Sequence, residues 1–243
     1  MLHQPNPLAD PNLMEGLISV RKMHLRAFCE TGLSAADELL YPEIRSYLDD
    51  LLSYEAIGAR SVENQQHRLT ASGMDIPVGM KNPTSGDLAV MFHAIYAAQQ
   101  PQRFIFRGHE VTTDGNPLAH GILRGGQNRY GMYLPNYSRR DLEYCQREYE
   151  KKCLLNRSIL VDTSHANSNK HFQEQPYIAR DILLSRQRNP TLHTLIKGLL
   201  IESYLVEGCQ APSSSQTYGQ SVTDPCLGWE DTETLLYQIS ELC

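Results

Sequence analysis

The chain has 243 residues, of which 41% are hydrophobic and 21% charged, and its formal net charge is -6. This length and hydrophobic content suffice for one sizeable core, so we expect a single domain over residues 1–243 rather than a disordered or repetitive chain. The acidic balance leaves no surplus of lysine and arginine to neutralise a phosphate backbone or an anionic membrane surface. We therefore expect small-molecule partners, with no nucleic acid and no membrane among them.

Three features of the sequence indicate the cellular compartment of the protein. The most apolar stretch, residues 88–98, is interrupted by His93 and is much shorter than the roughly 20 residues needed to cross a bilayer. Residues 1–12 are polar and contain three prolines, unlike the charged segment and apolar core of a secretory signal. The six cysteines form no CxxC pair and no compact framework, which indicates reduced thiols. These features predict a cytoplasmic protein.

The first predicted element is a helix with no strand before it. Over residues 13–29 the apolar side chains recur at mostly helical spacing, and Thr31 and Gly32 then end the pattern. Short apolar runs separated by helix-like segments follow, and this alternation is typical of a parallel sheet. The runs are 35–40, 56–59, 78–80, 121–123, 159–161 and 199–201, and the helical connections are 42–52, 87–98, 138–152 and 173–186.

A hairpin is predicted between the third and fourth runs. Residues 103–106 and 110–113 read as two short strands around a turn that contains Gly108. After the last run, residues 210–220 are rich in serine, proline and glutamine and predict a loop, and residues 231–242 predict a final helix. The sequence therefore predicts an α/β fold with six parallel strands and one inserted hairpin.

A polar or charged residue stands at or just beyond the end of each apolar run. In a barrel of βα units these strand ends form the active-site face, and buried charges there are costly unless they are paired or coordinated. We therefore expect the set to converge on one site, although any single member could equally be a solvated loop residue. The six residues are Glu38, Arg60, Lys81, Arg124, His165 and Glu202.

Three of these residues are cations. Arg60, Lys81 and Arg124 suit a small polyanion that carries phosphate and carboxylate, because a guanidinium can bind either group through two parallel hydrogen bonds. The alternative is that each cation forms a structural ion pair with a neighbouring carboxylate. A single Arg-Gly-Gly sequence beginning at Arg124 could be read as an RNA-binding fragment, but one copy after an apolar strand in an acidic protein argues against that interpretation.

A second group combines an imidazole with two carboxylates. His165, Glu202 and Asp224 form a mixed nitrogen and oxygen set that suits a divalent cation acting as a Lewis acid. Spacing alone is a weak indication, because a lone histidine is often a hydrogen-bonded structural residue. His165 does lie in a segment that is dense in small polar residues, residues 162–168.

Seven motifs in the same order resemble those of type I 3-deoxy-D-arabino-heptulosonate 7-phosphate (DAHP) synthases. Residues 57–68 resemble the family's IGAR(T)xESQxHR stretch, and residues 71–73 with 77–82 resemble its ASG and PVGFKN stretches. Together the motifs span nearly the whole chain. The remaining four lie at residues 122–126, 161–168, 201–208 and 218–232.

The resemblance implies a (β/α)8 TIM barrel that condenses phosphoenolpyruvate with erythrose 4-phosphate and releases phosphate. This is the first step of the shikimate pathway to chorismate and the aromatic amino acids, or of a specialised pathway that uses the same precursors. By motif position, the resemblance implies that Arg60, Lys81 and Arg124 bind phosphoenolpyruvate and that Glu38 stands near that substrate and the reacting water. Lys81, Glu38 and His165 are thus the expected catalytic residues.

The resemblance also implies a metal. His165, Glu202 and Asp224 correspond to three of the family's four ligands to a divalent cation of the manganese, iron, cobalt or zinc class. The family's GPC motif, which carries the fourth ligand, and its KPR motif, which helps hold both substrates, do not occur in this sequence. One alternative is that Cys226, two residues from Asp224, substitutes as a ligand.

Residues 1–32 match only the family's region between its second and third strands, with the first match at residues 8–12. We therefore expect strands three to eight of the barrel, an N-terminally truncated form, and weak or undetectable condensation by the isolated chain. We expect a homo-oligomer or association with an intact homologue. The alternative function is a catalytically impaired homologue that acts as an oligomerisation or regulatory partner of a full-length synthase.

Overall fold

The computed structural model describes residues 10, 12–212 and 216–243. Most of the polar start of the chain and most of the motif match at residues 8–12 lie outside the described residues. Part of the loop expected at 210–220 also lies outside them, because residues 213–215 are not described.

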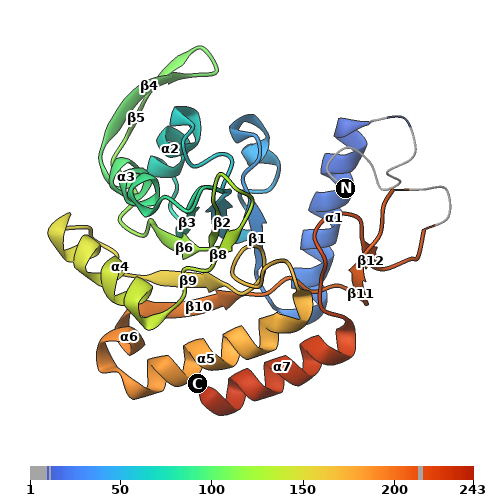
Figure 1. The fold of residues 1–243 in the computed structure, drawn as a ribbon. Coiled ribbons are helices and arrows are strands. Elements are labelled where there is room, and N and C mark those ends of the chain that lie inside the picture. The colour runs from blue at the N-terminus through green and yellow to red at the C-terminus, as the bar shows by residue number, and fades with distance from the viewer. Residues whose placement is uncertain (1–9, 11, 213–215) are drawn as a thin grey trace.

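A curled sheet of six parallel strands forms the centre of the fold (Figure 1). Each strand pairs in parallel with the next sheet strand along the chain, so the sheet order follows the sequence. Such a sheet fits a barrel of the (β/α)8 type and confirms the parallel α/β prediction. The strands are β1 (Ala35–Glu38), β2 (Leu52–Ile57), β3 (Val78–Lys81), β6 (His120–Leu123), β9 (Ile159–Asp162) and β10 (Ile196–Leu200).

The helices lie between and beside these strands. The helices predicted at 13–29, 87–98, 138–152, 173–186 and 231–242 are confirmed, with ends that differ by a few residues. The α-helices are α1 (Leu13–Thr31), α2 (Gln65–Ser72), α3 (Leu88–Gln99), α4 (Arg139–Lys151), α5 (Gln175–Arg188), α6 (Pro190–Leu195) and α7 (Trp229–Leu242), and the 3-10 helices are η1 (Pro42–Tyr47) and η2 (Phe172–Glu174).

The connection between β1 and β2 differs from its prediction. The sequence predicted a helix over 42–52 and a strand over 56–59, but the structure has only η1, and β2 already begins at Leu52. The cause is a charge that belongs to the strand: Glu55 is buried in β2 because Arg45 of η1 binds it, with Nε 3.1 Å from Oε2. A carboxylate in the middle of a strand concealed the apolar pattern that would have identified it.

Two helices, α2 and α6, were missed by the prediction. Each begins after an asparagine whose side chain accepts a backbone N–H of the first turn, Asn64 for α2 and Asn189 for α6. Asparagine is among the preferred residues at this position, so this local signal was present in the sequence. Both helices are short, and α2 is polar, which explains why apolar periodicity did not reveal them.

The predicted hairpin is confirmed. β4 (Gln102–Phe106) and β5 (His109–Thr113) pair antiparallel and project from the sheet in Figure 1. Their turn places both Arg107 and Gly108 at positive φ, 50° and 80°. Two further small pairs were not predicted: β7 (Gly126–Gln127) with β8 (Tyr133–Leu134), and β11 (Val206–Cys209) with β12 (Gln220–Ser221).

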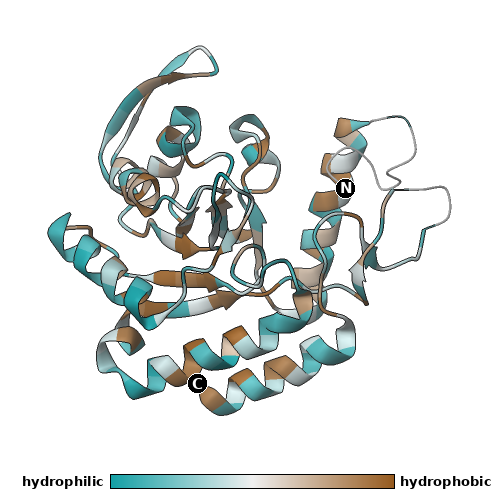
Figure 2. Cartoon of the chain, in the orientation of Figure 1, coloured by the Kyte–Doolittle hydropathy of each residue, from teal (hydrophilic) through white to brown (hydrophobic). Residues whose placement is uncertain are grey.

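The core lies on both sides of the central strands. β6 and β9 are predominantly hydrophobic, whereas α4 is largely hydrophilic on its visible side (Figure 2). Gly79 of β3 has no room for a side chain. A carbon added there would collide with the Tyr54 hydroxyl and with Ile122, because these two side chains pack directly over the glycine. Each fully buried aliphatic side chain of this core contributes roughly 1.5–3 kcal/mol to the free energy of unfolding.

Among the helices of the described residues, none combines the length and the apolar character that a membrane span needs.

One buried hydroxyl joins β6, β9 and α4. Tyr149 of α4 is fully buried against Phe92, and its hydroxyl donates to the Ser158 carbonyl at 2.6 Å while accepting the Gly121 N–H at 2.8 Å. Because the surroundings are apolar, these backbone groups have no water to replace the hydroxyl.

We therefore predict that Tyr149→Phe lowers the free energy of unfolding by about 1–3 kcal/mol, since the buried Gly121 N–H and Ser158 carbonyl lose the hydroxyl and keep only their long 3.4 Å contact with each other. Chemical denaturation followed by circular dichroism measures this loss. The matched control is Tyr144→Phe on the same helix, whose side chain is partly exposed, and it should change stability by less than about 0.5 kcal/mol. Equal losses in the two variants would contradict the prediction.

Candidate functional site

The predicted residues do converge at the carboxyl ends of the strands. Six of them line one cavity of about 130 Å³, and the seventh, Glu202, lies behind His165 with its Oε1 3.4 Å from the imidazole Nε2. Residues that come from β1 to β9 and from the loop after β12 thus meet at one mouth. The six that line the cavity are Glu38, Arg60, Lys81, Arg124, His165 and Asp224.

Lys81, the last residue of β3, is held between two carboxylates. Its Nζ lies 2.9 Å from Glu38 Oε2 and 3.8 Å from Asp162 Oδ2. Burial lowers the pKa of this ammonium, but the neighbouring carboxylates outweigh that effect, and the net pKa is raised. Lys81 therefore remains a cation inside the site.

The two arginines have no such partner. Arg124 directly follows β6 and is 8% exposed, and burial lowers its pKa, yet a guanidinium stays charged at any physiological pH. Among the described residues, neither Arg124 nor Arg60 forms an ion pair with a carboxylate. The alternative of structural ion pairs thus holds for Lys81 alone, and the cavity keeps two cations available for an anion.

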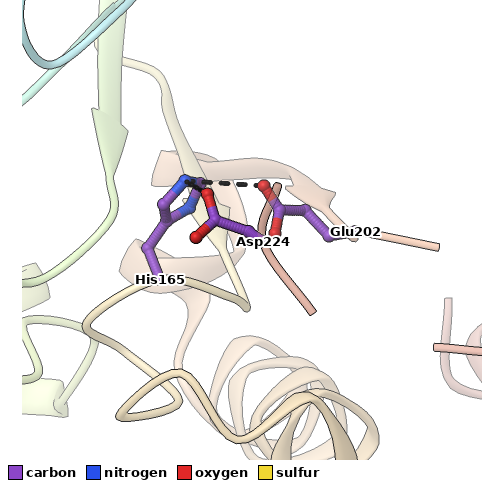
Figure 3. Close-up of side chains that lie close together, drawn as sticks. All are labelled: His165, Glu202 and Asp224. Atoms are coloured by element: carbon purple, nitrogen blue, oxygen red, sulfur yellow. Dashed lines mark ion pairs between the residues drawn. The ribbon is translucent and has the colours of Figure 1, made fainter. Parts of the chain in front are cut away.

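His165 is oriented by residues on its own turn. Its Nδ1 lies 2.9 Å from Asp162 Oδ2 and 2.9 Å from Ser164 Oγ. Burial lowers the pKa of the imidazole, but the hydrogen bond to Asp162 and the negative charges of Asp162 and Glu202 together outweigh it, and the net pKa is raised. The backbone of His165 lies in the left-handed region, at a φ of 50°, which turns the ring towards Glu202 and Asp224 (Figure 3). Nε2 is consequently the nitrogen that faces the two carboxylates.

Glu202 follows β10 and presents an oxygen without a partner. Its Oε2 is buried and accepts no hydrogen bond from the residues that the structure describes, and burial raises the pKa of the carboxyl group. Its backbone is fixed by Gln175 of α5, which accepts from the Glu202 N–H and donates to the Glu202 carbonyl, both at 2.9 Å. A buried carboxylate oxygen with no donor is costly, unless a cation or a ligand completes its coordination.

Asp224 completes a group that could hold a metal ion. One ligand atom each from His165, Glu202 and Asp224 lies within 4.8 Å of the other two. Asp224 Oδ2 is 3.7 Å from His165 Nε2, while its Oδ1 accepts from Lys170 at 2.7 Å. Burial raises the pKa of Asp224, but Lys170, with the charges of His165 and Arg124, outweighs it and the net pKa is lowered. The donor set and the orphaned Glu202 oxygen both fit a divalent cation.

Cys226 does not join this group. The cysteine is buried, and its thiol donates to the backbone carbonyl of Asp224, with the sulfur 3.4 Å from that oxygen. The alternative in which Cys226 serves as a further ligand therefore has no geometric support.

Three buried asparagines that the site prediction missed tie the strand ends together. Asn82 Oδ1 accepts from the Arg124 N–H at 2.9 Å and from Asn136 Nδ2 at 3.0 Å. Asn136 accepts from the Gly125 N–H, and its own N–H donates to Asn167. Asn82 and Asn167 lie inside motifs quoted above, but Asn136 carried no signal in the sequence. This network holds the loops after β3, β6 and β9 in register with one another.

We predict that Asn82→Ala lowers the free energy of unfolding by at least about 2 kcal/mol, because four hydrogen bonds in a buried place are lost. The control is Asn128→Ala, which removes two acceptor contacts in an exposed turn, where water replaces them, and should cost less than about 1 kcal/mol. Chemical denaturation of both variants decides, and a loss for Asn82→Ala no larger than that for Asn128→Ala would refute the network's importance.

Fold and site together define a protein of the (β/α)8 class whose charged groups gather where such barrels hold their active sites. The model of the DAHP synthetase I family matches residues 9–237, and the chain belongs to this family. The resemblance to type I DAHP synthases is thereby confirmed.

Comparison with individual relatives supports the same family assignment. The Tyr-sensitive phospho-2-dehydro-3-deoxyheptonate aldolase of Escherichia coli (strain K12) is 40% identical over 249 residues, covering 99% of this chain and 67% of the relative. The phospho-2-dehydro-3-deoxyheptonate aldolase of Haemophilus influenzae is 41% identical over 241 residues, covering 94% of this chain and 62% of the relative. The solved structure of the Francisella tularensis SCHU S4 enzyme of that name has a TM-score of 0.87 at 34% identity, over 97% of this chain and 67% of that one. The chain thus spans about two thirds of the length of these relatives.

Proposed function

We propose that this protein acts as a DAHP synthase, which condenses phosphoenolpyruvate with erythrose 4-phosphate in the first step towards the aromatic amino acids. One observation carries the proposal: Arg60 and Arg124, which form no ion pair among the described residues, share a cavity with His165 and Asp224, two members of the group that could hold a divalent metal. The relatives from Escherichia coli and Haemophilus influenzae, which are named phospho-2-dehydro-3-deoxyheptonate aldolases, support it.

The cations account for the anionic substrate. Arg124 and Arg60 are proposed to bind the phosphate and carboxylate of phosphoenolpyruvate, since planar guanidinium groups match both. Lys81 carries a third positive charge at the base of the cavity, and its raised pKa keeps that proton in place. Binding of a dianion would neutralise the charges of Arg60 and Arg124, which form no ion pair with a carboxylate in the described structure.

His165, Glu202 and Asp224 would hold the metal, a divalent cation of the manganese, iron, cobalt or zinc class. When bound, it would supply Lewis acidity to the aldehyde of the sugar phosphate. Asp162 keeps the proton of His165 at Nδ1 and thereby leaves Nε2 free to serve as a ligand.

Glu38 is proposed to act on the water that takes part in the reaction. It stands at the end of β1, and its Oε2 is 2.9 Å from Lys81 Nζ, so the carboxylate is oriented towards the cavity. A carboxylate in this position can accept a hydrogen bond from a water beside the substrate and orient it.

Substrate binding provides the first test. Isothermal titration of the chain with phosphoenolpyruvate should show binding, and Arg124→Met should weaken it about 10- to 100-fold, the loss expected for hydrogen bonds to a charged group. Arg124 forms no ion pair with a carboxylate in the described part of the chain, so its removal leaves no carboxylate there without a bonded cation. Lys151→Met on the exposed end of α4 is the control and should leave the affinity unchanged. Unaltered binding in Arg124→Met would remove this residue from the proposed site.

Turnover provides the second test. With phosphoenolpyruvate, erythrose 4-phosphate and Mn²⁺, we expect DAHP formation that stops when the metal is chelated. The rate should lie below about one per second, because the GPC and KPR motifs do not occur in the sequence. A faster rate would contradict that expectation, and activity that persists after chelation would contradict the metal's role.

The partner hypothesis makes a different prediction in the same assay. A chain that serves only to oligomerise with a full-length synthase, or to regulate it, would bind substrate without forming product. It would instead form a stable complex with a full-length synthase in gel filtration and would change that synthase's rate.

A further inference from the structure

The three proposed metal ligands differ in how they are held. Asp162 and Ser164 fix the imidazole of His165, and Gln175 fixes the backbone of Glu202. Among the described residues, the carboxylate of Asp224 accepts a side-chain hydrogen bond from Lys170 alone, at 2.7 Å. The third ligand thus has a single support.

Asp224 is tied to the sheet less closely than the other two ligands. It lies on the loop after β12, outside the six-stranded sheet, whereas His165 and Glu202 lie three and two residues beyond the ends of the sheet strands β9 and β10. Its side chain is 35% exposed, so water competes for its oxygens. Without a tether, the carboxylate would sample several orientations, and most of them would not face the imidazole.

Lys170 is built into the turn that carries His165. Its backbone N–H donates to the His165 carbonyl at 2.8 Å, which closes the turn. Asn169 and Lys170 both adopt positive φ, 53° and 60°, a conformation that side chains other than glycine rarely take. The Ala166 N–H binds the Arg124 carbonyl at 3.2 Å and fixes the turn against the strand end. One rigid turn therefore aims both the imidazole and the ammonium at Asp224.

The two oxygens of Asp224 are divided between these groups. Lys170 Nζ contacts Oδ1, and Oδ2 is the oxygen that lies 3.7 Å from His165 Nε2. The ammonium therefore orients the carboxylate while leaving one oxygen towards the metal group.

We infer that Lys170 is a positioning residue, which holds Asp224 ready for a divalent cation. The inference rests on the proposed metal site and adds a residue to it. Partners of this kind typically account for 10- to 100-fold in metal affinity. Repulsion between the ammonium and the metal opposes the effect, but the ammonium binds Oδ1 directly at 2.7 Å, whereas Oδ2 is the oxygen that faces the metal group.

The test is isothermal titration of the full chain with Mn²⁺ alone. Lys170→Met, which keeps the aliphatic stem but has no hydrogen-bond donor, should weaken binding about 10- to 100-fold. Lys170→Arg retains a donor and should restore affinity to within about threefold of the unmodified chain. Lys151→Met, the exposed control, should bind as the unmodified chain does.

A double-mutant cycle tests whether Lys170 acts through Asp224. If it does, adding Lys170→Met to Asp224→Asn should cause no further loss of Mn²⁺ affinity, whereas independent effects would add. Thermal unfolding without metal should show both Lys170 variants folded at the temperature of the titration, so that a loss of affinity reports on the site.

Three outcomes would overturn the inference. Affinity that is unchanged or tighter in Lys170→Met would mean that the ammonium does not support the ligand or competes with the metal. Additive losses in the cycle would mean that Lys170 acts elsewhere. Failure of the proposed function looks different: the unmodified chain would bind no Mn²⁺, or would bind it equally well after Asp224→Asn.

Discussion

The buried carboxylate of Asp162 joins the two halves of the site. It is the last residue of β9 and is 2% exposed, yet it contacts His165 Nδ1 at 2.9 Å and lies 3.8 Å from Lys81 Nζ. Burial alone would raise its pKa, but these two neighbours and Ser164 lower it overall. An anion at the centre of the strand ends therefore stabilises a cation of the anion-binding pocket and orients a ligand of the metal group at the same time.

The cost of burying these charges explains the polar residues around them. Neutral asparagines satisfy the backbone groups of the loops after β3, β6 and β9, so that these loops can pack closely without adding further charge. Gln175 does the same for the loop after β10. Each of these amides pairs buried donors with buried acceptors across neighbouring strands, which is where an unpaired group would be most damaging.

The sequence predicted well where local pattern and strand order decide the outcome. A charged residue after each apolar run was enough to bring Glu38, Lys81 and Arg124 to one mouth, because parallel strands present their carboxyl ends at the same edge. The full extent of β2 was harder to predict. The charge of Glu55 can be buried in this strand because Arg45 binds it, and the sequence does not reveal that contact.

Supporting residues were also beyond local pattern. Asn136 functions through Asn82 and Asn167, which lie 54 and 31 residues away along the chain, and Lys170 through Asp224, 54 residues away. An amide or an ammonium in a loop looks the same in the sequence whether it faces water or a buried partner. The short helices α2 and α6 were missed for a related reason, as their asparagine caps are local but their packing is not.

The sequential order of the sheet also bears on how the chain folds. Each strand pairs with the next sheet strand along the chain, so every pairing has to close only the loop of one crossover and never a longer segment of the chain. Contacts at the mouth of the site join residues that are far apart in the chain. Lys170 and Asp224, for example, can meet only after the last strands have docked. The hydrophobic sheet can therefore assemble progressively, whereas the charged mouth becomes ordered only once the chain that carries its last ligand is in place.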